Sequence, residues 1–361
     1  PMALLMVENW LTSRIEGALY GGAIGEALGG PVEGGSPEAV IEVHGGLVRE
    51  LLPYLPHPRA NRERPARPPG TTTDDTHFKN LLCRAIVNTG GRIDAAGLAA
   101  ELPAEDPYAY LVMRQALLRL ESFRQIYRPD RSRHAHIPLA DTAAHHGGQG
   151  LTPANGAVMM ISPVGLMYPG DPKAAYLAGY EVACAVQQGY SADMAGVVAA
   201  GVAAALTPQT DSSAVVGAMI DVAPAEGAAM LRETARIVGE VDDIESFRKL
   251  WQEELSIHWL DPGETVSVAA GSLLLAEGDF SSTVLNAVNF GRDCDTIATV
   301  AGAIAGALNG AESIPQDWIE TVDAARGEEP SQKELALGIS GALATELARV
   351  REWAGRYEPL L

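Results

Sequence analysis

Hydrophobic positions recur at helical spacing through most of the chain. Alanine, leucine, glutamate and methionine dominate this pattern, whereas alternating runs of β-branched residues, which are typical of strands, are sparse. The pattern predicts helices over residues 114–124, 174–188, 194–206, 228–238, 244–251, 266–275, 281–289 and 335–357. Proline and glycine lie between these segments, and no shift in composition marks a domain boundary. We therefore expect a single all-α domain over residues 1–361.

Two further helical segments carry glycine at every fourth position. The first ridge consists of Gly17, Gly21, Gly25 and Gly29, and the second of Gly302, Gly306 and Gly310. Glycine inside a helix costs about 1 kcal/mol relative to alanine, so a repeated ridge is favourable only where another backbone comes very close. Ordinary tight packing explains either ridge alone. Taken together, they predict two helices at the centre of the fold, with their ends near each other.

Composition and charge narrow the class of protein. Hydrophobic residues make up 47% and charged residues 20%, which excludes global disorder. The 26 basic against 46 acidic residues give a net charge of −20, which repels a phosphate backbone. The most apolar stretches, 194–206 and 297–308, are too short to cross a bilayer, and residues 1–10 lack the features of a secretory signal. We expect a soluble, cytoplasmic protein that binds neither nucleic acid nor a membrane.

Two acidic motifs carry the candidate chemistry: TTTDDT at residues 71–76 and GRDCDT at residues 291–296. Each places two carboxylates and a threonine at a predicted helix start, and the first helix is predicted to end near Val87. The oxygen-bearing side chains are Thr73, Asp74, Asp75, Asp293, Asp295 and Thr296. Helix capping explains either motif alone, but a cap needs one oxygen, and crowded carboxylates repel unless a cation neutralises them. Hard oxygen ligands suit Mg²⁺, Mn²⁺ or Ca²⁺, so two facing motifs could hold two metal ions.

These motifs, together with AIGEALGGPVE near the amino terminus, resemble the ADP-ribosylglycohydrolase family in residues and in order, over roughly residues 13–310. The resemblance implies a compact orthogonal helical bundle with two Mg²⁺ (or Mn²⁺) ions in a cleft. The six oxygen-bearing residues would be metal ligands, and Glu33 would take part in catalysis. The segment 154–163 resembles the loop that lines the ADP-ribose pocket. Implied substrate contacts are Asn155, Gly156, Ala157, Met159, Ser162 and Gly291. Many members have aspartate where this chain has Glu26, and arginine where it has Met160. Because the second difference removes a fixed charge and five donors, we expect recognition near this loop to differ from that of the family.

The family resemblance and the ligand chemistry together suggest a metal-dependent hydrolase of a ribosyl glycosidic bond. The substrate would be ADP-ribose on a modified protein acceptor, and Glu33 would move a proton. Three alternatives stay open. The first is a hydrolase of small ribosylated metabolites such as nucleosides, nucleotides or N-ribosides, and the second is a non-catalytic ADP-ribose-binding or structural protein. The third is a two-metal phosphohydrolase, which the ligands alone would permit.

Two predicted loops have an unusual composition. The segment 57–70 carries Arg59, Arg62, Arg64 and Arg67, which could bind phosphates, although we favour a solvated loop as their explanation. The segment 131–150 carries His134, His136, His145 and His146, whose spacing matches no common zinc pattern. Cys294 lies between two candidate ligands, and we interpret it as a small buried residue rather than a nucleophile.

Overall fold

The computed structural model describes residues 2–35, 37–55, 66–102, 114–126 and 144–360. Sixteen α-helices occupy these residues: α1 Met2–Gly29, α2 Pro37–His44, α3 Asp74–Thr89, α4 Ala95–Glu101, α5 Arg114–Ile126, α7 Ser162–Leu166, α8 Pro172–Ala183, α9 Tyr190–Ala205, α10 Ser212–Val222, α11 Ala225–Val238, α12 Ile244–Glu254, α13 Pro262–Leu275, α14 Phe280–Phe290, α15 Cys294–Asn309, α16 Gln316–Ala325 and α17 Gln332–Tyr357. Short 3-10 helices are η1 Gly30–Val32, η4 Ala311–Ser313 and η5 Glu358–Leu360. Within the described ranges there is no β-strand, only an isolated bridge between Tyr54 and Arg67. The all-α prediction is confirmed.

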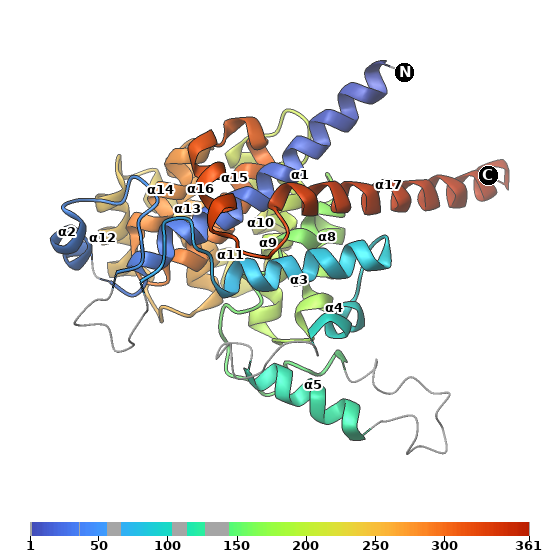
Figure 1. Ribbon diagram of the computed structural model, residues 1–361, viewed down its shortest axis with the longest axis horizontal. Coiled ribbons are helices and arrows are strands. Elements are labelled where there is room, and N and C mark those ends of the chain that lie inside the picture. Colours follow the sequence, from blue (N-terminus) through green and yellow to red (C-terminus); the bar gives the residue numbers. More distant parts are fainter. Residues whose placement is uncertain (1, 36, 56–65, 103–113, 127–143, 361) are drawn as a thin grey trace.

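The two glycine ridges meet at the centre of the fold. A Cβ atom on Gly21 would lie 2.1 Å from the carbonyl oxygen of Gly302, and one on Gly302 would lie 2.1 Å from that of Gly21. Gly17 faces Gly306 in the same way, so α1 and α15 run antiparallel with their backbones in contact. Figure 1 shows α1 running from the N-terminus into the middle of the molecule. The predicted packing of the ridges is confirmed, and it brings the end of α1 to the start of α15.

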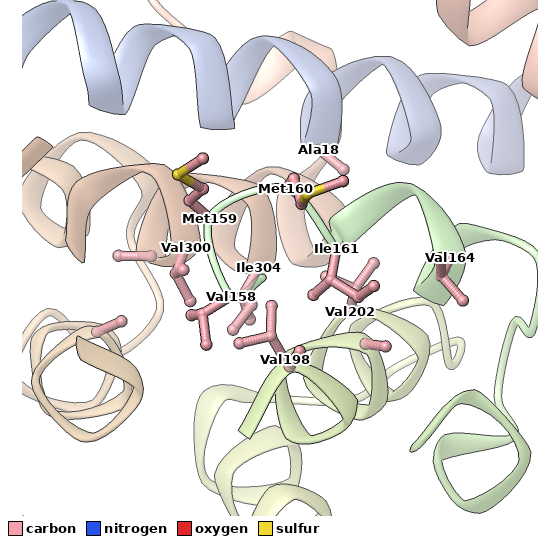
Figure 2. Close-up of a cluster of buried hydrophobic side chains, with 14 of the residues drawn as sticks. Ala18, Val158, Met159, Met160, Ile161, Val164, Val198, Val202, Val300 and Ile304 are labelled. Atoms are coloured by element: carbon pink, nitrogen blue, oxygen red, sulfur yellow. The ribbon is translucent and has the colours of Figure 1, made fainter. Parts of the chain in front are cut away.

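A cluster of aliphatic and methionine side chains fills the space beside this helix pair. Figure 2 shows residues 158–161 lying among α1, α9 and α15, with Met160 next to Ala18. Val198 and Val202 of α9 complete the cluster, together with Val300 and Ile304 of α15. Met160 is buried. Methionine at this position therefore belongs to the hydrophobic core.

One predicted helix end is wrong. The periodicity extends a helix over 174–188, whereas α8 ends at Ala183. The carbonyl of Cys184 accepts a hydrogen bond from the backbone N–H of Gly148 at 3.1 Å, and a Cβ on Gly147 would lie 2.0 Å from the carbonyl oxygen of Ala185. Gly148 thus binds the Cys184 carbonyl, which in a continuing helix would accept a hydrogen bond from a later residue of that helix. This tertiary contact ends the helix early.

Candidate metal centre

The start of α3 is capped by a residue from another helix. Thr73 is the N-cap, but its side chain makes no capping bond. Instead Glu26 of α1, fully buried, accepts hydrogen bonds from the backbone N–H of Thr73 at 2.6 Å, the Thr73 hydroxyl at 2.7 Å and the backbone N–H of Thr76 at 3.0 Å. A carboxylate at a helix N-terminus satisfies free N–H groups and meets the positive end of the helix dipole. This contact holds Asp74 and Asp75 against the end of α1.

The start of α15 lies beside the same end of α1. A Cβ on Gly29 would lie 2.5 Å from the Cα of Asp295, so only glycine allows this approach. Asp293 is the N-cap of α15, yet its side chain makes no capping bond. Its Oδ2 instead accepts a hydrogen bond from Nδ2 of Asn155, which also donates to the Thr265 hydroxyl at 2.9 Å. The carboxylate of Asp293 is therefore held by a side chain rather than used as a helix cap.

The acidic side chains gather into two groups of three. Their members are Glu26, Asp74 and Asp75 in one group, and Glu33, Asp293 and Asp295 in the other. Within each group one carboxylate oxygen per residue lies within 4.8 Å of the other two. The Thr296 hydroxyl, 3.4 Å from Oδ1 of Asp75, connects the groups. Both triads can hold a divalent metal ion, and because every donor is an oxygen, the chemistry fits Mg²⁺ or Mn²⁺.

Burial makes the charged form of these carboxylates unfavourable. It raises the pKa of Asp75 and Asp295 well above the ordinary range, with a further rise from neighbouring carboxylates. Burial also raises the pKa of Glu26, and that of Asp293 to about 7. The buried Lys79 beneath the site has its own pKa lowered to about 8 by burial, and its ammonium donates to the carbonyl of Leu19. A divalent cation among these oxygens would relieve their repulsion.

Five of these six acidic residues, all except Glu26, line a cavity of about 710 Å³. All six residues of the two sequence motifs lie on its wall, as do Glu33, Asn155 and Met159. Four other candidate substrate contacts are buried and not among its lining residues: Gly156, Ala157, Ser162 and Gly291. Met160 is likewise absent from this lining. Met160 therefore does not line the cavity, contrary to the expectation that it changes substrate recognition near the 154–163 segment.

Several residues in and beside the site were not predicted from sequence. Glu26 is the most important, and its signal was a lone carboxylate inside an apolar, glycine-rich helix. The cavity wall also includes Tyr54, Trp259 and Arg326. Of the arginine-rich segment, Arg67 lines the cavity, with its guanidinium 5.7 Å from the centre of the Tyr54 ring. The other three arginines, Arg59, Arg62 and Arg64, lie outside the described residues.

His145 and His146 of the histidine-rich segment, and Cys294, are not among the lining residues. His134 and His136 fall outside the described residues, whereas His145 and His146 are exposed. Nδ1 of His145 lies 4.0 Å from a carboxylate oxygen of Glu181 on α8. Cys294 is fully buried, and burial raises the pKa of its thiol well above the ordinary value. This agrees with its interpretation as a packing residue.

Fold and site together define an all-α protein with two acidic clusters at a cavity that could hold metal ions. The chain belongs to the ADP-ribosylglycohydrolase family, whose sequence profile matches residues 8–354. It is 29% identical to the uncharacterized protein YegU of Escherichia coli (strain K12) over 84% of this chain and 90% of that one. An uncharacterized protein of Archaeoglobus fulgidus is 27% identical over 86% of this chain and 92% of its own. ADP-ribosylhydrolase ARH3 of Mus musculus is 46% identical over 41 residues, 11% of this chain and of its own.

A solved structure confirms the fold class. It is described as an ADP-ribosylglycohydrolase-related protein complex and superimposes with a TM-score of 0.65 at 22% identity, over 93% of this chain and 99% of its own. At this identity the likeness concerns the fold alone. None of the described helices combines the length and the hydropathy that crossing a membrane requires.

Proposed function

We propose that the chain is a metal-dependent glycosidase that hydrolyses a ribosyl glycosidic bond, with ADP-ribose on a modified acceptor as its substrate. The observation that carries this proposal is the pair of carboxylate triads, of which five of the six members line one cavity. Family membership supports glycoside hydrolysis over phosphate-ester hydrolysis, which the ligands alone would also permit.

Two divalent cations would occupy the site, one per triad. Glu26, Asp74 and Asp75 would hold the first, and Glu33, Asp293 and Asp295 the second, with the hydroxyls of Thr73 and Thr296 beside them. Bound there, Mg²⁺ or Mn²⁺ would supply positive charge that orients the substrate's oxygens and polarises a water molecule. The remaining chemistry falls to the side chains of this chain.

Glu33 would transfer the proton. It follows η1 rather than a helix start, and it is the half-buried member of its triad, next to the buried Asp293 and Asp295. Its carboxylate therefore faces both the metal-binding oxygens and the open cavity. A carboxylate there can accept a proton from the attacking water. Asn155 would keep the neighbouring Asp293 in place by donating to its Oδ2 atom.

The residues of the cavity wall suit a nucleotide. Arg67 and Arg326 bring positive charge to a chain whose net charge is −20, and a guanidinium pairs well with phosphate oxygens. Tyr54 and Trp259 add aromatic surface to the same wall. The short match to the mouse ADP-ribosylhydrolase supports the same substrate class.

A substrate screen tests the proposal. Peptides carrying ADP-ribose on arginine or serine, and small N-ribosides, would be incubated with Mg²⁺ or Mn²⁺ and analysed by mass spectrometry. We expect release of ADP-ribose from at least one peptide class, and its loss in Asp293→Ala. Release from small ribosides alone would show that the substrate is a small ribosylated metabolite rather than a modified acceptor. No turnover of any substrate by metal-loaded protein would refute the enzymatic function and favour a binding protein.

A further inference from the structure

Arg292 has a backbone conformation that residues with a side chain rarely adopt. Its φ is +63°, in the left-handed region that favours glycine. It lies directly before Asp293, a member of the second carboxylate triad. An arginine persists in such a conformation only where its surroundings compensate for the strain.

The compensation is a partly buried ion pair. Nε of Arg292 donates to Oε1 of Glu264, and Nη2 donates to Oε2 at 3.1 Å. The Glu264 side chain, in the first turn of α13, is only 1% exposed. Burial raises the pKa of this carboxyl, and the guanidinium opposes the rise. Two parallel charge-assisted bonds fix the planar guanidinium in one orientation.

The same pair contacts three parts of the cavity wall. The carbonyl oxygen of Arg292 accepts a hydrogen bond at 2.9 Å from the backbone N–H of Gly34, the residue after Glu33. Oε2 of Glu264 also accepts from the backbone N–H of Ile257 at 3.3 Å. The segment 257–260 that begins there supplies Trp259 and Leu260 to the cavity wall. The pair thus connects the Glu33 loop, the start of α15 and the segment 257–260, which we call the rim.

We propose that the Arg292–Glu264 pair is a positioning device that holds Glu33 against Asp293 and fixes the 257–260 rim. This inference rests on the metal centre of the proposed function. Neither side chain of the pair is among the cavity lining, so both act through other residues. Without the pair, the Glu33 loop and Asp293 can move apart although every carboxylate of the triad is still present.

Two variants separate positioning from simple stability. Arg292→Gly removes the strain at φ +63° but leaves Glu264 buried without its cation, which is destabilising. The double variant Arg292→Gly with Glu264→Gln also removes that unpaired charge. Arg236→Ala is the matched control, because it deletes an exposed arginine whose ion pairs lie on the surface. The readouts are the melting temperature and the Mn²⁺ dissociation constant, the latter from an EPR titration well below the melting temperature.

We expect Arg292→Gly to weaken Mn²⁺ binding by about 10- to 100-fold, the usual effect of losing a residue that orients a ligand. The double variant recovers the melting temperature but not the Mn²⁺ affinity, and Arg236→Ala retains wild-type affinity. Recovery of both properties together in the double variant would overturn the proposal, as would a wild-type protein that binds no Mn²⁺. A wild-type protein that binds Mn²⁺ but hydrolyses no glycoside would refute only the proposed function.

Discussion

Replacing Gly21 by alanine tests the central contact between α1 and α15, because helix propensity and packing change the stability of the protein in opposite directions. In a solvated helix this change would stabilise the protein by about 1 kcal/mol. Here the new Cβ would lie 2.1 Å from the carbonyl oxygen and 2.7 Å from the carbonyl carbon of Gly302. Both obstacles are main-chain atoms, so no side chain can rotate away, and α1 and α15 must separate by roughly 1 Å to restore ordinary contact. Overpacking of this kind costs about 1–3 kcal/mol, which after the gain in helix propensity leaves a net loss of up to about 2 kcal/mol.

Gly341→Ala provides the matched control. Gly341 lies inside α17, and a Cβ there would meet no atom within 4 Å. This variant should therefore gain the helix propensity without a clash and become more stable by about 1 kcal/mol. Urea unfolding followed by far-UV circular dichroism, in EDTA so that metal makes no contribution, measures both changes. Stabilisation of the Gly21→Ala protein to the same extent as the control would refute the backbone contact between α1 and α15.

Three further predictions concern the site. Glu33→Gln should lower turnover by about 10²- to 10⁴-fold with metal content near wild type by ICP mass spectrometry; full activity would remove Glu33 from the mechanism. Because burial raises the folded-state pKa of Asp293 from 3.8 to about 7, the metal-free protein should lose stability as pH rises from about 4 to 8, on the order of 4 kcal/mol at most. Mg²⁺ should remove that decline in calorimetric scans, and parallel curves with and without Mg²⁺ would contradict it. Arg67→Ala should raise KM for an ADP-ribosylated peptide about tenfold at unchanged kcat, whereas an unchanged KM would exclude Arg67 from substrate binding.

The centre of the fold could be predicted because its signals are local. Glycine spacing alone indicates that two backbones meet, and paired aspartates at helix starts indicate an oxygen-rich site. Several helices escaped prediction, including α10 and α16. For α10 the signal was present, since Asp211 accepts a capping bond from the backbone N–H of Ala214. Short helices depend on the tertiary contacts of their apolar face more than on propensity.

Other parts of the site depend on contacts between distant segments. Glu26 is a lone carboxylate until the start of α3 is placed against it, 47 residues further along the chain. The pairing of Arg292 with Glu264 joins residues that carry no common motif. Met160 was read as a change at the substrate pocket, whereas the path of the 158–161 segment places it in the core (Figure 2). Sequence spacing identifies residues that share one helix face, but it does not show which faces meet.

The central claim is that two separate helix starts jointly hold two divalent cations. An EPR titration of the metal-free protein with Mn²⁺ tests it most directly. We predict two Mn²⁺ ions per chain with the spectrum of a spin-coupled pair, and loss of that coupling in both Asp75→Asn and Asp295→Asn. A single uncoupled ion, or a coupled pair that survives both substitutions, would contradict the account.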